Sequence, residues 1–271
     1  MESEEEARKM RVVVFGAGYF GKNYIRELGR NCVLVVDPNK SARDEVQKRF
    51  RLPAFSKLPD DFDFDAAVIV TSPLLHYKIA LPLLKKDKYV LVEKPLALTY
   101  EHAVDLASYP KCMAGLVYLY HPEVEKLRDR AACVQFSHIY SRRTNDGPVR
   151  PYLSAAWDLL PHDISIFNFV TQEKVKKVRG FGNRDYYVLQ IIYPLNQAFA
   201  YASWFGGPKT RLVELVPSIG QRVIFDDLKV VLEEPPLTRM IRAFLSGEWD
   251  RCTGAEGAEV VRVLEEVQCD A

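Results

Sequence analysis

The chain has 271 residues, of which 48% are hydrophobic and 27% charged, a balance that is typical of a globular protein with one large or two medium domains. Its 37 Lys and Arg nearly cancel its 36 Asp and Glu, and no basic block alternates with aromatic residues, so we expect no nucleic-acid partner. No apolar run approaches the roughly 18 residues of a membrane span, so we expect no membrane partner.

The five cysteines are odd in number and form no CxxC pair, which argues against a disulfide framework and against a zinc site. We therefore expect no metal and a reducing, cytoplasmic environment. The acidic N-terminus "MESEEEARK" lacks the apolar stretch of a signal peptide, and we expect residues 1–9 to form a flexible tail. Met10 could equally be the start of the protein.

From Met10 onward, short β-branched runs alternate with helical stretches, a pattern that predicts βαβ units around a parallel sheet. The first strand, in 11–18, runs into a glycine turn. The further predicted strands are 32–37, 65–72, 89–95 and 112–120, and the predicted helices are 19–30, 41–50, 75–86 and 99–108. We therefore predict a doubly wound α/β domain over residues 10–120.

Beyond residue 120 the pattern changes, because β-rich segments follow one another without regular helices between them. The predicted strands are 133–141, 186–194, 197–205, 209–218, 221–227 and 229–234, and the predicted helices are 123–131, one containing 157–166, 237–247 and 256–267. This pattern predicts a second, α+β domain over residues 121–271, with an open and mostly antiparallel sheet.

The glycine turn "GAGYFG" places Gly16, Gly18 and Gly21 in the GxGxxG pattern, between a buried strand and a helix. These glycines allow a tight turn, close approach of backbone N–H groups to a pyrophosphate, and close packing of helix on strand, so a Rossmann dinucleotide site is expected. Asp37, at the end of the second strand, can accept both ribose hydroxyls and would repel a 2′-phosphate, which favours NAD over NADP. The alternatives are a turn without a ligand and, for Asp37, a solvated turn acid.

Other residues near the glycine turn also bear on the predicted dinucleotide site. Tyr19 and Phe20 lie inside the motif and are further cofactor-binding candidates. Lys40 and Arg43 follow Asp37 closely enough to weaken the preference for NAD.

Residues after the third and fourth strands are candidates because ligands lie across the carboxyl ends of a doubly wound sheet. The third strand should bring four residues near the ribose and nicotinamide: Thr71, Ser72, Pro73 and His76. The fourth should bring Glu93 and Lys94 beside the reacting carbon, since core packing does not explain a charged pair after "YVLV". Pro95 could hold a cis bond. A surface ion pair is the alternative for the two charges.

The segment "WDLLPHDISI" carries Asp158, His162 and Asp163 within an apolar run. In a helix, Asp158 and His162 share one face, and their Cβ atoms lie roughly 5–6 Å apart. A histidine can accept a proton at neutral pH, and a carboxylate hydrogen-bonded to its other ring nitrogen would orient it. A satisfied core histidine is the alternative. We expect Asp163 to be structural, and Pro161 to mark the beginning of the helix.

Several motifs together resemble one family. "GAGYFG", "TSPLLHY", "EKPLALT", "YHPEV", "WDLLPHDISI", "SWFGGPKTR" and "EGAEVVRVLEEV" are similar to motifs of the glucose-fructose oxidoreductase / inositol 2-dehydrogenase family (Gfo/Idh/MocA). Within it they are most similar to the UDP-N-acetylglucosaminuronate 3-dehydrogenase branch. The resemblance covers nearly the whole chain from Met10, and it implies a Rossmann domain coupled to an open-sheet domain.

The resemblance also implies roles for individual residues. Lys94 would contact the nicotinamide ribose and the reacting hydroxyl, and Asp158 and His162 would match the family's catalytic pair. Arg143, Asn145 and Arg150 match positions at which the sugar-acid branch binds substrate.

We therefore expect an NAD-dependent enzyme that oxidises a secondary hydroxyl, at C3 of a UDP-linked amino-sugar acid. The alternatives are another sugar, polyol or inositol dehydrogenase, an NADP-dependent reductase of the same family, and a non-catalytic dinucleotide-binding regulator. The open sheet is a natural subunit interface, so a homodimer or homotetramer is expected.

Overall fold

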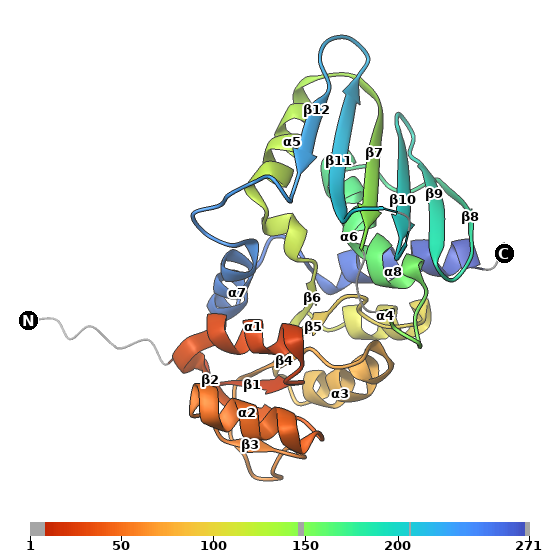
Figure 1. Ribbon diagram of the computed structural model, residues 1–271. Helices are drawn as coiled ribbons and strands as arrows, with labels where there is room; N and C mark the ends of the chain where they lie inside the picture. The colour runs from red at the N-terminus through yellow and green to blue at the C-terminus, as the bar shows by residue number, and fades with distance from the viewer. Residues whose placement is uncertain (1–8, 146–148, 206, 269–271) are drawn as a thin grey trace, which may run out of the picture.

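The computed structural model describes residues 9–145, 149–205 and 207–268, and it places two six-stranded sheets one above the other (Figure 1). The predicted tail, apart from Lys9, lies outside the described residues. The first sheet and its helices form the lower part of the view, and the second sheet forms the upper part. The predicted order of an α/β part followed by an α+β part is confirmed.

The first sheet is parallel throughout. Its strands, in spatial order, are β3 (Ala54–Phe55), β2 (Cys32–Val36), β1 (Val12–Phe15), β4 (Ala66–Ile69), β5 (Tyr89–Glu93) and β6 (Cys112–Gly115). The β-branched runs of β1 and β4 are wholly buried, as continuous apolar strands covered on both faces require. The order reverses between β1 and β4, so the carboxyl ends of these strands form the crevice at which doubly wound sheets bind ligands.

Two details of this sheet differ from the prediction. The strand predicted over 112–120 ends at Gly115, because the Leu116 N–H bonds back to the Ala114 carbonyl and turns the chain into the 3-10 helix η2 (Val117–Tyr120). The strand β3 is absent from the prediction, since two residues are too few to show an alternating pattern.

Four helices accompany the first sheet: α1 (Tyr19–Leu28), α2 (Lys40–Phe50), α3 (Pro73–Lys85) and α4 (Tyr100–Ala107). Local chemistry explains where they begin. The Asn39 side chain accepts the first backbone N–H groups of α2, Thr99 does the same for α4, and Pro73 occupies the first turn of α3. Gly18 precedes α1 at the N-cap position and offers no side chain to cap it, which leaves the N-terminal N–H groups of the helix available to a ligand.

The second sheet is open and mostly antiparallel, as predicted. Its strands, in spatial order, are β12 (Val223–Asp226), β11 (Thr210–Pro217), β7 (Phe136–Thr144), β10 (Gln197–Ser203), β9 (Tyr186–Ile192) and β8 (Lys177–Gly182). Only β7 and β10 pair in parallel. The strand β8 is absent from the prediction, and 229–234 is not a strand. That run lies beyond the edge strand β12, where Val231 is 96% exposed and has no apolar surface to cover it.

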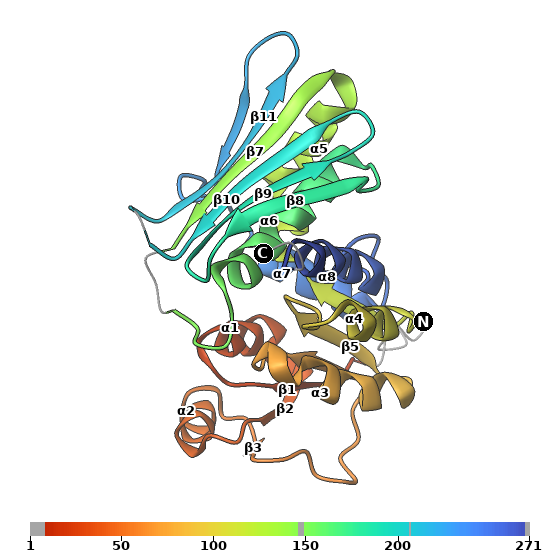
Figure 2. The same cartoon turned by 90° about the vertical axis from the view of Figure 1, so that its right-hand side faces the viewer.

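Helices α5 (Pro122–Cys133), α6 (Ala155–Thr171) and α8 (Gly254–Gln268) lie on one side of the second sheet, and no described helix lies on its other face (Figure 2). The prediction that α6 begins at Pro161 is wrong. The Ser154 side chain caps α6 by accepting the Trp157 N–H, so the helix begins two turns earlier and Pro161 lies inside it. Burial of almost the whole helix offsets the loss of one backbone hydrogen bond.

The last two helices return to the first part of the chain. Helix α7 (Pro236–Ser246) packs against α1 and η2, and Thr238 donates a hydrogen bond to Glu27. Helix α8 packs against α4 and β6 as well as α6, and the Ala114 N–H bonds to the Cys252 carbonyl beside it. These contacts join the two sheets. The division into 10–120 and 121–271 stays a prediction.

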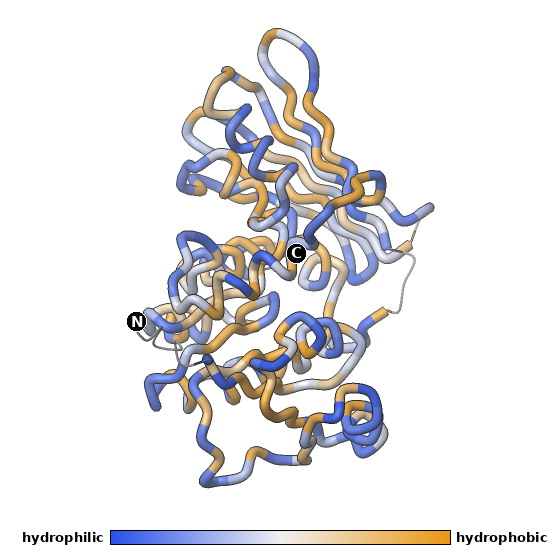
Figure 3. The backbone as a smooth tube through the Cα atoms, turned by 90° about the vertical axis from the view of Figure 1, so that its left-hand side faces the viewer, coloured by the Kyte–Doolittle hydropathy of each residue, from blue (hydrophilic) through white to orange (hydrophobic). Residues whose placement is uncertain are grey.

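Apolar residues follow the strands of both sheets, whereas the outer turns of the helices are largely hydrophilic (Figure 3). Within the described ranges, no helix combines the length and the apolar character that crossing a membrane would need.

Candidate active site

The glycine turn between β1 and α1 has the geometry of a phosphate cradle. A Cβ atom on Gly16 would lie 2.5 Å from the Val70 carbonyl oxygen, and one on Gly21 would lie 2.1 Å from the Gly16 oxygen. Gly18 differs, because a Cβ there would meet nothing within 4 Å. Internal packing therefore requires the outer two glycines, whereas Gly18 keeps the space in front of the α1 N-terminus open. That N-terminus carries partial positive charge and no acid in its first turn.

The Asp37 carboxylate is fixed at the edge of this turn. Its Oδ2 accepts the Ala17 N–H at 2.7 Å, and its Oδ1 accepts the Asn39 N–H at 2.8 Å. Each oxygen keeps a lone pair for a ribose hydroxyl, so the residue fits the adenosine end of NAD. Lys40 pairs with Asp44, whereas the Arg43 guanidinium donates to the main-chain carbonyl of Asp37 and so lies beside this residue. The expectation that Lys40 and Arg43 weaken the preference for NAD stays a prediction.

Two aromatic residues at the start of α1 lie at the surface. Tyr19 is 87% exposed and Phe20 is 38% exposed. Both side chains are therefore free to contact a ligand at the turn, and that role stays a prediction.

Residues after β4 shape the next part of the crevice. The Ser72 hydroxyl is buried without a hydrogen-bond partner among the described residues, and Pro73 opens α3 beside it. His76 is 1% exposed, with Nδ1 2.8 Å from the Pro95 carbonyl oxygen and Nε2 3.2 Å from that of Thr71. Burial lowers the pKa of His76 to about 4. This geometry favours a structural role, in which His76 links the chain at Thr71 to the chain at Pro95, over direct contact with a cofactor.

Glu93 points inward from the end of β5. Its Oε1 accepts the Tyr24 hydroxyl at 2.6 Å, and its Oε2 accepts the Lys94 N–H at 2.9 Å. Burial raises the pKa of the Glu93 carboxyl, and it also raises that of Tyr24. Glu93 thus ties α1 to β5 instead of reaching toward a reacting carbon. The Lys94–Pro95 peptide bond is cis, as the sequence allowed.

Lys94 reaches from the first domain to α6. Its Nζ donates to the Asp158 main-chain oxygen at 2.5 Å and lies 3.4 Å from the Asp158 Oδ1. The Arg150 Nε lies 3.5 Å from the same Oδ1, and the Trp204 Nε1 donates to Oδ2 at 3.2 Å. The Asp158 carboxylate therefore lies between two cations and is held by a buried indole.

The charges of this group shift its proton affinities. Burial lowers the pKa of Lys94, and the nearby Asp158 carboxylate opposes that effect. Burial acts to raise the pKa of Asp158, but Lys94, Arg150 and Trp204 together hold it below its usual value. Asp158 is thus a carboxylate at neutral pH, beside an amine that loses its proton more easily than an exposed lysine.

The expected hydrogen bond between Asp158 and His162 is absent. Both residues lie on the predicted helix, but the Asp158 carboxylate is engaged by Lys94, Arg150 and Trp204. The His162 Nδ1 is buried without a partner among the described residues. Burial and nearby cations, first among them Lys94, lower the pKa of His162 well below its usual value, so the ring is neutral at pH 7.

Arg143 is committed to a buried ion pair. Its Nε and Nη2 donate to the two carboxylate oxygens of Asp163 at 2.9 and 3.0 Å, and its Nη1 donates to the Tyr118 hydroxyl at 3.2 Å. Arg143 is 4% exposed and Asp163 is 1% exposed. Asp163 is structural, as predicted, whereas the guanidinium of Arg143 has no free edge for substrate. Asn145 is half-buried, and its backbone N–H bonds to the Ser203 carbonyl.

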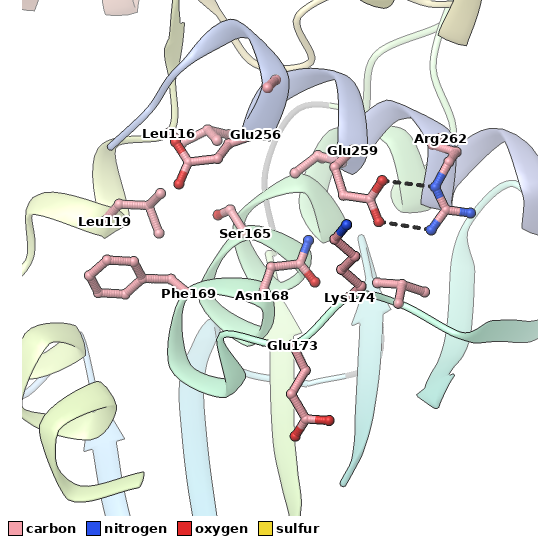
Figure 4. A pocket seen from close by; sticks show the side chains of 13 residues that line it. Leu116, Leu119, Ser165, Asn168, Phe169, Glu173, Lys174, Glu256, Glu259 and Arg262 are labelled. Carbon is pink, nitrogen blue, oxygen red and sulfur yellow. Dashed lines mark hydrogen bonds and ion pairs between the residues drawn. The ribbon is translucent and has the colours of Figure 1, made fainter. Parts of the chain in front are cut away.

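A cavity of about 540 Å³ lies elsewhere, between η2, α6 and α8 (Figure 4). None of the predicted site residues lines it. Two of its charged groups are bonded to each other, since Arg262 donates to Glu259, and Glu256 caps α8 through Thr253. Because none of the predicted site residues lies there, the crevice at Lys94 remains the candidate site.

Known proteins add to this geometry. Residues 10–121 match the family model described as an oxidoreductase family with an NAD-binding Rossmann fold. Over these residues the chain is similar to the Gfo/Idh/MocA oxidoreductase family. The first domain is accordingly an NAD-binding domain, and the resemblance seen in the sequence motifs is confirmed.

Curated relatives are similar over part of their length. The inositol 2-dehydrogenase of Acidothermus cellulolyticus is 24% identical over 65% of this chain and 58% of that enzyme. The scyllo-inositol 2-dehydrogenase (NAD+) of Bacillus subtilis is 24% identical over 64% of this chain and 57% of that enzyme. The chain thus spans less than three fifths of the curated relatives that it matches.

Solved structures share the fold over nearly the whole chain. UDP-N-acetylglucosamine 3-dehydrogenase GnnA from Acidithiobacillus ferrooxidans has a TM-score of 0.84 at 21% identity, over 96% of this chain and 98% of that one. GenD2 from gentamicin A biosynthesis, in complex with NAD, has a TM-score of 0.86 at 20% identity, over 100% of this chain and 96% of that one. At these identities the likeness establishes the two-domain fold alone.

Proposed function

We propose that the protein is an NAD-dependent dehydrogenase that oxidises a secondary hydroxyl of a sugar or polyol. The observation that carries this proposal is the contact of Lys94, at the end of a strand in the NAD-binding domain, with Asp158 on α6. Arg150 lies beside the same carboxylate, and His162 lies one turn further along the helix. A hydroxyl placed between Lys94 and His162 would meet groups from both domains.

When bound, NAD supplies the hydride acceptor, and the chain has to manage the hydroxyl proton. The Lys94 ammonium, held by the Asp158 carbonyl, would polarise the hydroxyl oxygen. His162 is neutral at pH 7, so one of its ring nitrogens carries a lone pair that can take the hydroxyl proton. Asp158 keeps Lys94 directed toward the crevice and offsets its charge. The proposed roles are thus Lys94 and His162 in proton transfer and Asp158 in support.

For the substrate, we propose a UDP-linked amino-sugar acid oxidised at C3. One observation supports a negatively charged substrate: the Arg150 guanidinium is half exposed beside the Lys94–Asp158 pair. The similarity of this chain to two inositol dehydrogenases keeps a polyol as the second candidate.

The test is NADH formation from a panel of UDP-sugars, UDP-amino-sugar acids, free sugars and inositols. We expect turnover with an acidic sugar nucleotide, and its loss in the Lys94→Ala and His162→Ala variants. The variant Lys126→Ala, which removes an exposed cation on α5, is the matched control. Turnover with inositol alone would identify a polyol as the substrate in place of a sugar nucleotide. Undiminished turnover in both active-site variants would refute the roles assigned to Lys94 and His162.

The uncovered face of the second sheet supports a homo-oligomer. Exposed apolar residues on its strands include Phe181, Tyr186 and Ile224, which are 64%, 39% and 60% exposed. We propose that this face joins two or four subunits. Light scattering at micromolar concentration tests this proposal, and a monomer throughout would contradict it.

We also propose that the protein works in the cytoplasm. The thiols of Cys32, Cys112 and Cys252 are free and buried, as in a protein that folds under reducing conditions. Localisation of a fluorescent fusion would test this proposal.

A further inference from the structure

Tyr118 occupies the junction between the two domains. It lies in η2, directly after the last strand of the first sheet, and is 7% exposed. Its hydroxyl donates to the Asp227 Oδ2 at 2.7 Å and accepts from the Nη1 atoms of Arg143 at 3.2 Å and Arg211 at 3.4 Å. One donor and two lone pairs are all that a phenol offers. The hydroxyl is therefore fully used, and the orientation of the ring is fixed.

Asp227, the acceptor of this hydroxyl, is itself anchored. Burial acts to raise the pKa of its carboxyl, but bonds from His121, Tyr118 and Arg211 outweigh burial and lower that pKa. The His121 Nδ1 accepts the Glu123 N–H, so Nε2 carries the proton and faces the Asp227 Oδ1 at 3.5 Å. Asp227 thus remains an acceptor, and Tyr118 remains the donor.

The ring of Tyr118 contacts His162. The two ring centroids are 5.1 Å apart at an interplanar angle of 71°, and the Arg143 guanidinium lies 4.8 Å from the Tyr118 ring. No hydrogen bond orients the imidazole, because Asp158 is engaged elsewhere and the buried Nδ1 has no partner among the described residues. An edge-to-face contact can take the place of that bond, through packing and an N–H···π interaction.

We propose that Tyr118 is a positioning residue for His162, whose ring it holds so that Nδ1 stays buried and Nε2 is available to the crevice. The proposal rests on the proposed function, in which His162 handles the hydroxyl proton. The side chain of Tyr118 is fixed by Asp227, Arg143 and Arg211. These residues therefore connect the second sheet to His162 on α6. This arrangement replaces the carboxylate that was expected to orient the histidine.

The charged groups around His162 define what its titration will show. Four cations disfavour the imidazolium: Lys94 directly after β5, Arg143 in β7, Arg211 in β11 and Arg150 in the segment before α6. The Tyr118 ring shields the buried side of the imidazole. Removing that ring should admit water and bring the pKa of His162 back toward its usual value.

The experiment compares Tyr118→Phe and Tyr118→Leu with Phe225→Leu. Phe225 packs against Tyr118 and His121 in the same aromatic cluster but makes no ring contact with His162 among the described residues, so it controls for general loss of packing. With the substrate found in the panel, we expect kcat to fall about tenfold in Tyr118→Phe and about a hundredfold in Tyr118→Leu, with KM for NAD unchanged. The acid limb of the kcat/KM profile should move to higher pH, because a base with a higher pKa is protonated at higher pH.

A second readout needs no turnover. Nitrogen NMR of the histidine side chains, with His162→Gln to assign the signal, reports the tautomer and the pKa of His162 directly. We expect one tautomer in the wild type and, in Tyr118→Leu, mixed tautomers that titrate at higher pH. An unchanged His162 titration in Tyr118→Leu, or the same change in Phe225→Leu, would overturn the proposal. Absence of turnover with every substrate would refute the proposed function but would leave this measurement valid.

Discussion

Replacing Asp158 by Asn removes the negative charge between Lys94 and Arg150 while it preserves the shape of the side chain. The Lys94 Nζ and the Asp158 Oδ1 are 3.4 Å apart, and the side chains are only 13% and 8% exposed. At an effective dielectric constant of about 20, such a pair interacts by about 5 kcal/mol. Removing the carboxylate removes the largest interaction that favours the charged form of Lys94, so we expect the pKa of Lys94 to fall.

The direction of this change is fixed by the charges. Burial already lowers the pKa of Lys94, Asp158 is the main group that opposes burial, and Arg150 would repel the ammonium once the carboxylate is gone. Whether catalysis needs the ammonium or the free amine, the pH limb that belongs to Lys94 should move to lower pH in Asp158→Asn.

The assay is the rate at which an amine-specific reagent acylates Lys94, followed by peptide mass spectrometry as a function of pH. Only the free amine reacts, so the midpoint of the curve gives the pKa of Lys94 without any substrate. Asp44→Asn, which removes the partner of the exposed Lys40, should leave the curve unchanged. A midpoint that stays in place or rises in Asp158→Asn would refute the electrostatic reasoning.

Three further predictions concern cofactor and stability. Gly18→Ala should keep the melting temperature but weaken NAD binding at least tenfold. Gly21→Ala should lower the melting temperature, because its Cβ would lie 2.1 Å from the Gly16 oxygen. Calorimetry measures the melting temperature and the NAD affinity of each variant, and equal effects of the two variants would contradict the separate roles of the two glycines. Asp37→Ser should weaken NAD binding by about 1.5–3 kcal/mol and narrow the preference over NADP, and an unchanged ratio of the two affinities would count against Asp37 as the selector. Asp163→Asn should cost about 3–5 kcal/mol of unfolding free energy in denaturant titrations, because it leaves Arg143 buried without its counter-charge, and a loss below 1 kcal/mol would show that the pair is dispensable.

Local sequence patterns were sufficient to predict the first domain as an α/β unit, apart from the two-residue strand β3. A β-branched run, a glycine turn and a helix follow one another in the chain, so their contacts are short in sequence and their physical requirements are visible in composition. The same holds for the position of Lys94, because a residue directly after a parallel strand must lie at the carboxyl edge of the sheet. The strand wrongly predicted at 229–234 shows the limit, since its apolar residues have no neighbouring strand to cover them.

For the active-site helix, some features follow from the sequence and others only from the tertiary structure. The sequence by itself determined that Asp158 and His162 share one face of one helix, because the apolar run and the spacing are local. A place for this helix near the dinucleotide site was implied only by the family resemblance. Only the tertiary structure decided their partners. Asp158 is held by Lys94 and Trp204, which lie 64 and 46 residues away in the chain, and His162 rests on Tyr118. Partners so far apart are chosen by how the two sheets pack, and helical spacing carries no information about that packing.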